Sequence, residues 1–221
     1  MRNLLSFDSP VHKFVDKFAN LMILNFVTMI CCIPIITAGP ALTSLFYVTM
    51  KMVRNEEGGI LRNYFHSFRT NFLQGMLIGL IVIFVGAFLG LDLYYIYQML
   101  ADGKFYDYIV LVVICVSLIL YFMASTYVYP LLAKFENSTK QLLRTSLLLS
   151  IRHLPATLAI MVISLAPFLM LIYTPMTSAL AMIFYLVLGF AAIAYFQSVF
   201  FVRIFDQYIP KDTDNTEETT V

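Results

Sequence analysis

Ionisable and nucleophilic side chains are scattered along this sequence and do not form a recognisable catalytic set. The three histidines, His12, His66 and His153, are far apart and lie beside basic residues, which is typical of histidines at a surface. The sequence has no nucleophile elbow, His-Glu-x-x-His motif, P-loop or dinucleotide-binding fingerprint. We therefore expect a protein that is not an enzyme and that binds no cofactor.

The cysteines do not indicate a metal site or a disulfide framework. Cys31, Cys32 and Cys115 all lie within apolar stretches, and neighbouring cysteines such as the first two rarely bridge each other. No histidine or carboxylate lies within helical reach of them to complete a metal site. We expect neither a bound metal ion nor a disulfide.

Asp92 is the acidic residue closest to the interior of an apolar stretch. A carboxylate inside a membrane is a candidate proton or ion site. The nearby residues Tyr94, Tyr95 and Tyr97 instead suggest the aromatic belt of a membrane interface. Asp92 is therefore a candidate polar site, and a solvated or capping carboxylate is the interpretation that its neighbours favour.

The composition of the chain indicates a membrane protein. Of the 221 residues, 61% are hydrophobic and 12% are charged, whereas a soluble domain carries about 25% charged residues. Charge-free runs occupy residues 18–50, 70–91, 108–133 and 154–202, and about 20 apolar residues suffice to cross a bilayer as a helix. We expect an all-α polytopic protein of the lipid bilayer. Its net charge of +1 gives no indication of a nucleic-acid partner.

The number of membrane crossings depends on the first charge-free run. Pro34 interrupts its helical pattern, and Gly39-Pro40 marks a tight connection. If the run crosses twice, all 14 Lys and Arg residues except Lys104 lie on the cytoplasmic side, as the positive-inside tendency favours. The prediction is a six-helix transmembrane bundle whose first two helices form a short hairpin, with the second helix spanning or re-entrant and both termini cytoplasmic. The predicted spans are 17–35, 40–53, 71–97, 107–133, 154–173 and 178–203, in a single membrane domain of 1–206 followed by a polar, disordered tail of 207–221.

Two basic connections, 51–69 and 134–153, are predicted to be cytoplasmic and to contain amphipathic helices. In the first connection, at 100° per residue, one arc holds Ile60, Leu61, Tyr64, Phe65, Phe68 and Phe72, and the opposite side holds Arg62, His66 and Arg69. Such a helix either lies on lipid headgroups, which is the favoured interpretation, or docks a partner protein. In the second case Arg62, Phe65, Phe68 and Arg69 are the expected contact residues.

Four glycines of the third predicted span share one helix face. These are Gly75, Gly79, Gly86 and Gly90, whose spacing keeps them within roughly 60° of arc. A face without side chains allows a neighbouring backbone to approach closely. The neighbour is either another helix of this chain or a second copy, which would make the protein a homo-oligomer.

Several of these residues follow the pattern of a known family. The segments 24–59 and 63–79 resemble the YesL-like family of small bacterial integral membrane proteins, and 127–150 also fits its pattern. The resemblance lies in Pro34, Thr37, Gly39 and Pro40 of the hairpin and in Phe65, Phe68, Asn71 and Phe72 at the start of the third span. The sequence departs from the pattern in having no tryptophan.

The resemblance implies a location and a role, but no catalytic residues. It implies a multi-pass protein of the bacterial cell membrane. It also implies a structural role for Pro34, Thr37, Gly39, Pro40 and Asn71. The family has no assigned biochemical function, and its members are often encoded beside carbohydrate-uptake transporters. We therefore expect an accessory or regulatory partner of such a system, which would contact a membrane transporter or a cytoplasmic protein. The alternative is a small permease that acts on its own.

Overall fold

The computed structural model describes residues 10–56, 58–100, 105–173 and 175–208. The elements in chain order are α1 (Pro10–Cys32), the 3-10 turn η1 (Ile35–Thr37), α2 (Ala38–Val53), α3 (Ile60–Thr70), α4 (Phe72–Met99), α5 (Phe105–Lys134), α6 (Thr139–Arg152), α7 (Leu154–Tyr173), α8 (Pro175–Phe184), the π-helical segment η3 (Tyr185–Gly189) and α9 (Phe190–Phe205). The described part of the chain contains no β-strand, so the predicted all-α class is confirmed. The predicted tail, 207–221, lies outside the described residues from residue 209 onward.

Several helices are long and apolar enough to cross a bilayer. Within the described ranges there are four such segments: Val15–Cys32, Phe72–Met99, Phe105–Lys134 and Ser178–Phe205. The pair α6 and α7 adds a fifth if it is counted as one span broken by a bend of 102°. The protein is therefore a multi-pass membrane protein with four to five candidate spans among the described residues, and the six-helix count stays a prediction.

Helix α2 is the central helix of the molecule. It packs against α1, α3, α4, α5 and α9, and most of its residues are buried. The ring of Phe46 meets Phe201 edge-on at 5.8 Å between centroids, and the hydroxyls of Thr49 and Ser198 share a 2.7 Å hydrogen bond. A short apolar helix is typical of a protein core or a re-entrant segment. The predicted span 40–53 is therefore enclosed by protein and does not face lipid.

Segments that were predicted to be cytoplasmic lie together at one end of the described structure. Lys17 Nζ donates a 2.8 Å hydrogen bond to Asn55 Oδ1, which joins the first half of α1 to the end of α2. Arg54 forms an ion pair with Asp206 at the end of α9. The first turn of α4 is hydrogen-bonded to the loop between α5 and α6. These contacts join α1 to α2, α2 to α9, and α4 to the loop between α5 and α6.

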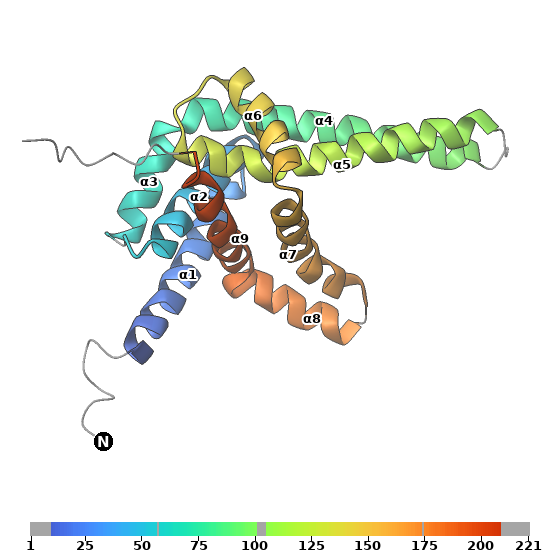
Figure 1. Cartoon of the computed structure of the whole chain (residues 1–221). Coiled ribbons are helices and arrows are strands. Elements are labelled where there is room, and N and C mark those ends of the chain that lie inside the picture. The colour runs from blue at the N-terminus through green and yellow to red at the C-terminus, as the bar shows by residue number, and fades with distance from the viewer. Residues whose placement is uncertain (1–9, 57, 101–104, 174, 209–221) are drawn as a thin grey trace, which may run out of the picture.

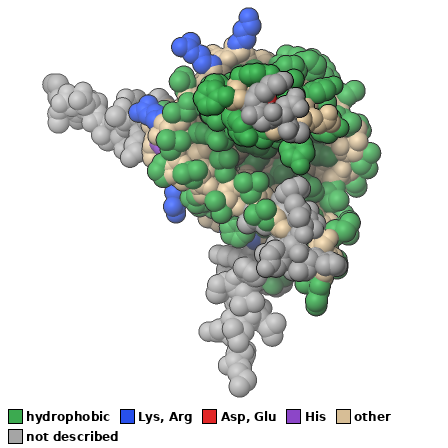
Figure 2. All heavy atoms as spheres, turned by 90° about the vertical axis from the view of Figure 1, so that its right-hand side faces the viewer, with side chains coloured by type: hydrophobic (Ala, Val, Ile, Leu, Met, Phe, Trp, Pro, Cys, Tyr) green, Lys and Arg blue, Asp and Glu red, His purple; other side chains and the backbone are tan. Residues whose placement is uncertain are grey.

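Helices α4 and α5 form a long antiparallel pair that extends away from the other helices (Figure 1). Apolar side chains cover most of the face on which this pair ends, whereas Lys and Arg side chains appear at its rim (Figure 2). Phe84 is 75% exposed and Val112 is 61% exposed on this pair. Large exposed apolar side chains along whole helices fit a lipid surrounding, because water would disfavour them.

Candidate functional site

Helix α3 folds back onto α2 through a turn that contains two left-handed residues. Asn55 has φ of 57° and Gly59 has φ of 58°, a conformation that asparagine and glycine adopt more readily than other residues. The Tyr64 side chain of α3 is fully buried, and its hydroxyl lies 3.4 Å from the Ala41 carbonyl oxygen. Burial raises the pKa of Tyr64, and a hydrogen bond with Thr28 lowers it in part. The neutral phenol therefore anchors α3 to the helices beneath it.

The apolar arc predicted for α3 divides into a packed part and an exposed part. Phe68 is half-buried and stacks on Tyr64 with centroids 6.3 Å apart, and it meets Phe72 at 5.6 Å. Leu61 is 46% exposed and Phe65 is 43% exposed. Phe68 therefore supports the helix, while Phe65 is available to lipid or to a partner.

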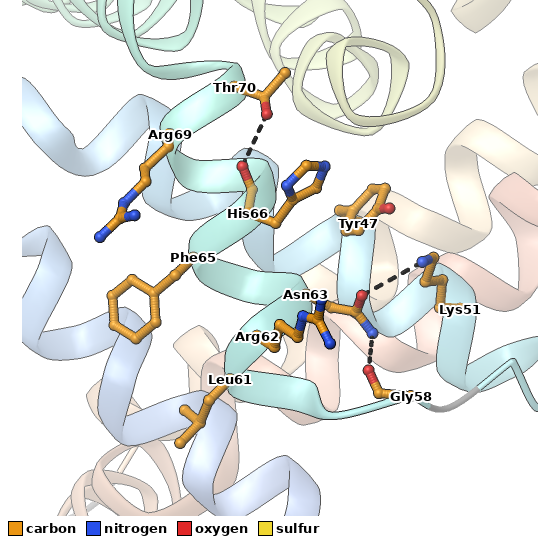
Figure 3. A pocket seen from close by; sticks show the side chains of 10 residues that line it. All are labelled: Tyr47, Lys51, Gly58, Leu61, Arg62, Asn63, Phe65, His66, Arg69 and Thr70. Atoms are coloured by element: carbon orange, nitrogen blue, oxygen red, sulfur yellow. Dashed lines mark hydrogen bonds between the residues drawn. The ribbon is translucent and has the colours of Figure 1, made fainter.

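An open depression of about 760 Å³ lies at the end of α2 and along α3, and we call it the α2–α3 depression (Figure 3). Its lining residues are Tyr47, Lys51, Gly58, Leu61, Arg62, Asn63, Phe65, His66, Arg69 and Thr70. Three of them are Lys or Arg, one is His, and none is Asp or Glu. The lining residues of the depression therefore carry a positive formal charge.

Neighbouring groups hold the Lys51 ammonium in position. Its Nζ lies 4.8 Å from the centroid of the Tyr47 ring, a cation–π arrangement. The same Nζ donates to Asn63 Oδ1 at 3.5 Å, and Asn63 Nδ2 donates to the Gly58 carbonyl oxygen at 2.5 Å. Since an ammonium has three N–H donors, Lys51 keeps donors for a further acceptor in the depression.

The predicted contact residues are divided between two sides of α3. Arg62, Phe65 and Arg69 line the α2–α3 depression, but Phe68 does not. Phe65 and Arg69 project away from Tyr47 and Lys51, as Figure 3 shows. Phe68 packs within α3 and at the start of α4, so its share in a contact surface with the other three residues stays a prediction.

The residues contributed by α2 were missed by sequence reasoning. Tyr47 and Lys51 are four residues apart, a spacing that places both on one face of a helix, and this spacing is the signal that could have identified them. Tyr47 also lines an adjoining depression of about 470 Å³ that includes His66 and Lys134. This second depression also includes Glu136, so the surface that continues from α3 toward the end of α5 is polar and carries both charges.

Two glycines of α4 pack directly against the first turn of α2. A Cβ added to Gly39 would lie 2.0 Å from the Gly75 carbonyl oxygen. A Cβ on Gly75 would lie 2.9 Å from the Pro40 nitrogen, and one on Gly79 would lie 3.1 Å from the Gly39 Cα. The structure therefore brings the hairpin residues and the first glycine pair together as a close backbone contact within one chain.

The other two glycines of the predicted face have different surroundings. A Cβ on Gly86 would lie 2.5 Å from the Tyr121 hydroxyl, which donates to the Val82 carbonyl oxygen at 2.8 Å. A Cβ on Gly90 would meet nothing within 4 Å. The first part of the glycine face therefore packs against other segments of the same chain. Contact of a second copy of the chain at Gly90 stays a prediction.

Thr37 and Asn71 bond to the backbone around them. Thr37 Oγ1 donates to the carbonyl oxygens of Cys31 at 2.7 Å and Pro34 at 2.9 Å, which closes the turn between α1 and α2. Asn71 Nδ2 donates to the Ser67 carbonyl oxygen at 3.1 Å. Asn71 makes no side-chain cap of α4, so it anchors that helix through the end of α3.

Asp92 lies on α4 and does not line the α2–α3 depression. It is half-buried, and Tyr94, Tyr95 and Tyr97 beside it are exposed. A second carboxylate, Asp107 in the first turn of α5, was missed; it is 2% exposed, and its Oδ2 has no hydrogen-bond partner among the described residues. The described residues contain no group of three or more His, Cys, Asp or Glu side chains that could hold a metal ion.

Comparisons with known proteins place these features in context. Residues 18–93 match the family model described as "Protein of unknown function, DUF624". The chain is also 28% identical over 137 residues to "Uncharacterized protein YteU" of Bacillus subtilis (strain 168). The chain is similar to a bacterial family of unknown function. The DUF624 match includes the turn η1, helices α2 and α3, and all four glycines of α4.

The similarity to the curated relative is partial. The aligned region covers 62% of this chain and 60% of the relative, so the chain spans about three fifths of the length of the protein that it matches. No solved structure matches this chain. The DUF624 match therefore covers most of the first four helices, and it assigns no activity.

Proposed function

We propose that the protein is a non-enzymatic accessory or regulatory partner of a carbohydrate-uptake system in a bacterial cell membrane. The observation that carries the accessory role is the exposed side of α3, where Arg62, Phe65 and Arg69 lie on a helix fixed to the bundle by the buried Tyr64. The carbohydrate-uptake part rests on the resemblance to the YesL-like family, whose members are often encoded beside such transporters.

The chemistry of α3 specifies the kind of partner. Neither Arg62 nor Arg69 forms an ion pair with a carboxylate of the described chain; the ion pair found there joins Arg54 and Asp206. Arginine and aromatic side chains are enriched at protein interfaces. A membrane or cytoplasmic protein that presents carboxylates around an apolar patch would complement this surface.

The partner contact is testable by charge reversal on α3. A photo-cross-linking amino acid at Leu61 is expected to capture a specific protein in cells, and Arg62→Glu or Arg69→Glu is expected to abolish that capture. The reason is that like charges brought together at an interface cost several kcal/mol. Both side chains are exposed, so insertion and melting temperature should not change.

The matched control is Arg144→Glu, which reverses an exposed charge on α6 instead of α3. Capture should persist in this variant. If cross-linking from α3 yields only lipid, or if the protein is captured equally from the Arg62→Glu and Arg69→Glu variants, the accessory role loses its basis.

The alternative function is a small permease, and one observation favours it. The π-helical segment η3 interrupts the helix that leads into α9 and contacts the buried Asn25 of α1. Interrupted helices and buried polar groups are common at transport sites. Substrate-dependent flux in proteoliposomes that contain only this chain would favour the permease over the accessory role.

We also propose a six-span arrangement in which α1 and α2 enter the membrane as a hairpin. The hydrogen bond between Lys17 and Asn55 supports this. In a hairpin, the start of the first helix and the end of the second lie on the same side of the membrane, and this bond joins those two regions. With 16 residues, α2 is about 24 Å long, shorter than the roughly 30 Å hydrocarbon core. A short or re-entrant second segment fits this length.

The arrangement predicts the accessibility of reporter tags in intact cells. Tags at the N-terminus, Glu57, Glu136 and the C-terminus should be cytoplasmic, and tags near Gly103 and Thr177 should be external, because Lys and Arg favour the cytoplasmic side. Both termini, Glu57 and Gly103 lie outside the described residues. An external N-terminus combined with an internal Glu57 would contradict the hairpin.

A further inference from the structure

The positive charge of the α2–α3 depression has no acidic counterpart among its lining residues. Lys51 lies on α2, and Arg62, His66 and Arg69 lie on α3. None of these side chains forms an ion pair with a carboxylate in the described part of the chain. Unneutralised cations from two helices around one concave surface favour an anionic ligand.

The donors in the depression match the chemistry of phosphate. Arginine guanidinium groups bind phosphate oxygens through two parallel N–H donors, and a lysine ammonium adds a compact charge. Lys51 is already oriented by the Tyr47 ring and by Asn63, so less of its conformational freedom is lost on binding. We infer that the α2–α3 depression binds an anionic phosphate group, carried either by a lipid headgroup or by a soluble phosphate.

The size and rim of the depression are compatible with both sources. A volume of about 760 Å³ is within the range of small-molecule sites and exceeds the size of a phosphate ion. Leu61 and Phe65 at the rim are exposed and apolar, as expected for a helix that lies at the headgroup level of a membrane. A phosphate ester in the lipid headgroup layer would reach the same donors as phosphate in solution.

The inference goes beyond the accessory role, and the two can fail separately. The partner contact is assigned to Arg62, Phe65 and Arg69, whereas Lys51 belongs to the opposite wall and projects on the other side from Phe65 and Arg69 (Figure 3). A Lys51 variant can therefore lose phosphate and still be captured by the partner.

The test is isothermal titration calorimetry on the full-length protein in a neutral detergent. One arm titrates phosphatidylglycerol dispersed in micelles, with zwitterionic phosphatidylcholine as the comparison, and the other arm titrates inorganic phosphate. Saturable binding of one ligand per chain is expected in at least one arm. Binding of phosphatidylglycerol alone identifies a lipid headgroup, and binding of inorganic phosphate identifies a soluble ligand.

Single-residue variants locate the site. Lys51→Gln and Arg62→Gln are each expected to raise the Kd about tenfold, because each removes a charge-assisted hydrogen bond. Arg144→Gln on α6 removes the same charge outside the depression and should change the Kd less than about twofold, since diffuse surface attraction is weak in a neutral micelle. Arg62 is exposed, so its variant tests the site even if Lys51→Gln alters folding.

Three results would overturn the inference. The first is the absence of saturable binding in both arms. The second is equal affinity for phosphatidylcholine and phosphatidylglycerol together with no binding of inorganic phosphate. The third is an equal loss of affinity in Arg144→Gln and in the Lys51→Gln and Arg62→Gln variants. Melting curves of each variant in detergent check that the fold is retained.

Discussion

Gly39→Ala is expected to separate the first turn of α2 from α4. We expect this variant to destabilise the protein more than the other glycine-to-alanine change tested, Gly90→Ala. The added Cβ would lie 2.0 Å from the Gly75 carbonyl oxygen, so a backbone, and not a flexible side chain, would have to move. Overpacking a close-packed core typically costs about 1–3 kcal/mol, and a clash between two backbones belongs at or above the upper end of that range.

The control for this prediction is Gly90→Ala on α4. Its Cβ meets nothing within 4 Å, and alanine is favoured over glycine within a helix by about 1 kcal/mol. Size-exclusion chromatography and thermal melting in detergent should show a loss of the monodisperse protein for Gly39→Ala and none for Gly90→Ala. Equal behaviour of the two variants would mean that α2 and α4 do not approach closely.

Larger side chains extend the same comparison along α4. Gly79→Leu should act like Gly39→Ala, because its Cβ would meet the Gly39 backbone. Gly86→Leu should be milder than Gly79→Leu, since the obstacle there is the movable Tyr121 side chain. Leu80→Phe changes an exposed side chain and should have little effect.

Asn25→Leu is expected to give the second large loss of stability. Asn25 is fully buried; its Nδ2 donates to the carbonyl oxygens of Tyr185 at 3.1 Å and Leu186 at 2.9 Å, and its Oδ1 accepts from the Ala191 N–H at 3.2 Å. Leucine cannot replace these bonds. Leaving buried polar groups unpaired costs about 1–3 kcal/mol each, and we expect a total loss of roughly 2–4 kcal/mol because η3 can relax in part.

Ser117→Ala is the control for Asn25→Leu. Ser117 Oγ donates to the Val113 carbonyl oxygen of its own helix at 2.9 Å, so the variant removes a side-chain hydrogen bond without separating two helices. Denaturant titration in mixed micelles should show a lower unfolding free energy for Asn25→Leu and a nearly unchanged value for Ser117→Ala. An unchanged value for both would show that η3 is held by other contacts.

The long helices could be predicted from sequence because hydropathy measures the transfer of side chains from water into lipid. Helix α4 was expected at 71–97 and runs over Phe72–Met99, and α5 was expected at 107–133 and runs over Phe105–Lys134. Helix α2 was expected as a span because the same apolar residues suit lipid and a protein core. Hydropathy alone does not distinguish these two environments.

The candidate site was only partly predictable for a related reason. Helical periodicity identified Arg62, Phe65 and Arg69, because these residues share one short helix. It also assigned Phe68 to the contact surface, since periodicity does not show which half of an apolar arc packs on the protein. Lys51 comes from a different helix, and only the fold of α3 onto α2 brings it to the site.

The enclosure of α2 determines when the protein can finish folding during synthesis. The ribosome produces α2 long before α5 and α9, which supply much of its surroundings. The hydroxyls of Thr43, Ser44 and Thr49 donate to carbonyl oxygens within α2 itself, so the helix is internally satisfied while these partners are absent. Insertion of the early helices and burial of α2 are therefore separate events, and the second must wait until α9 has left the ribosome.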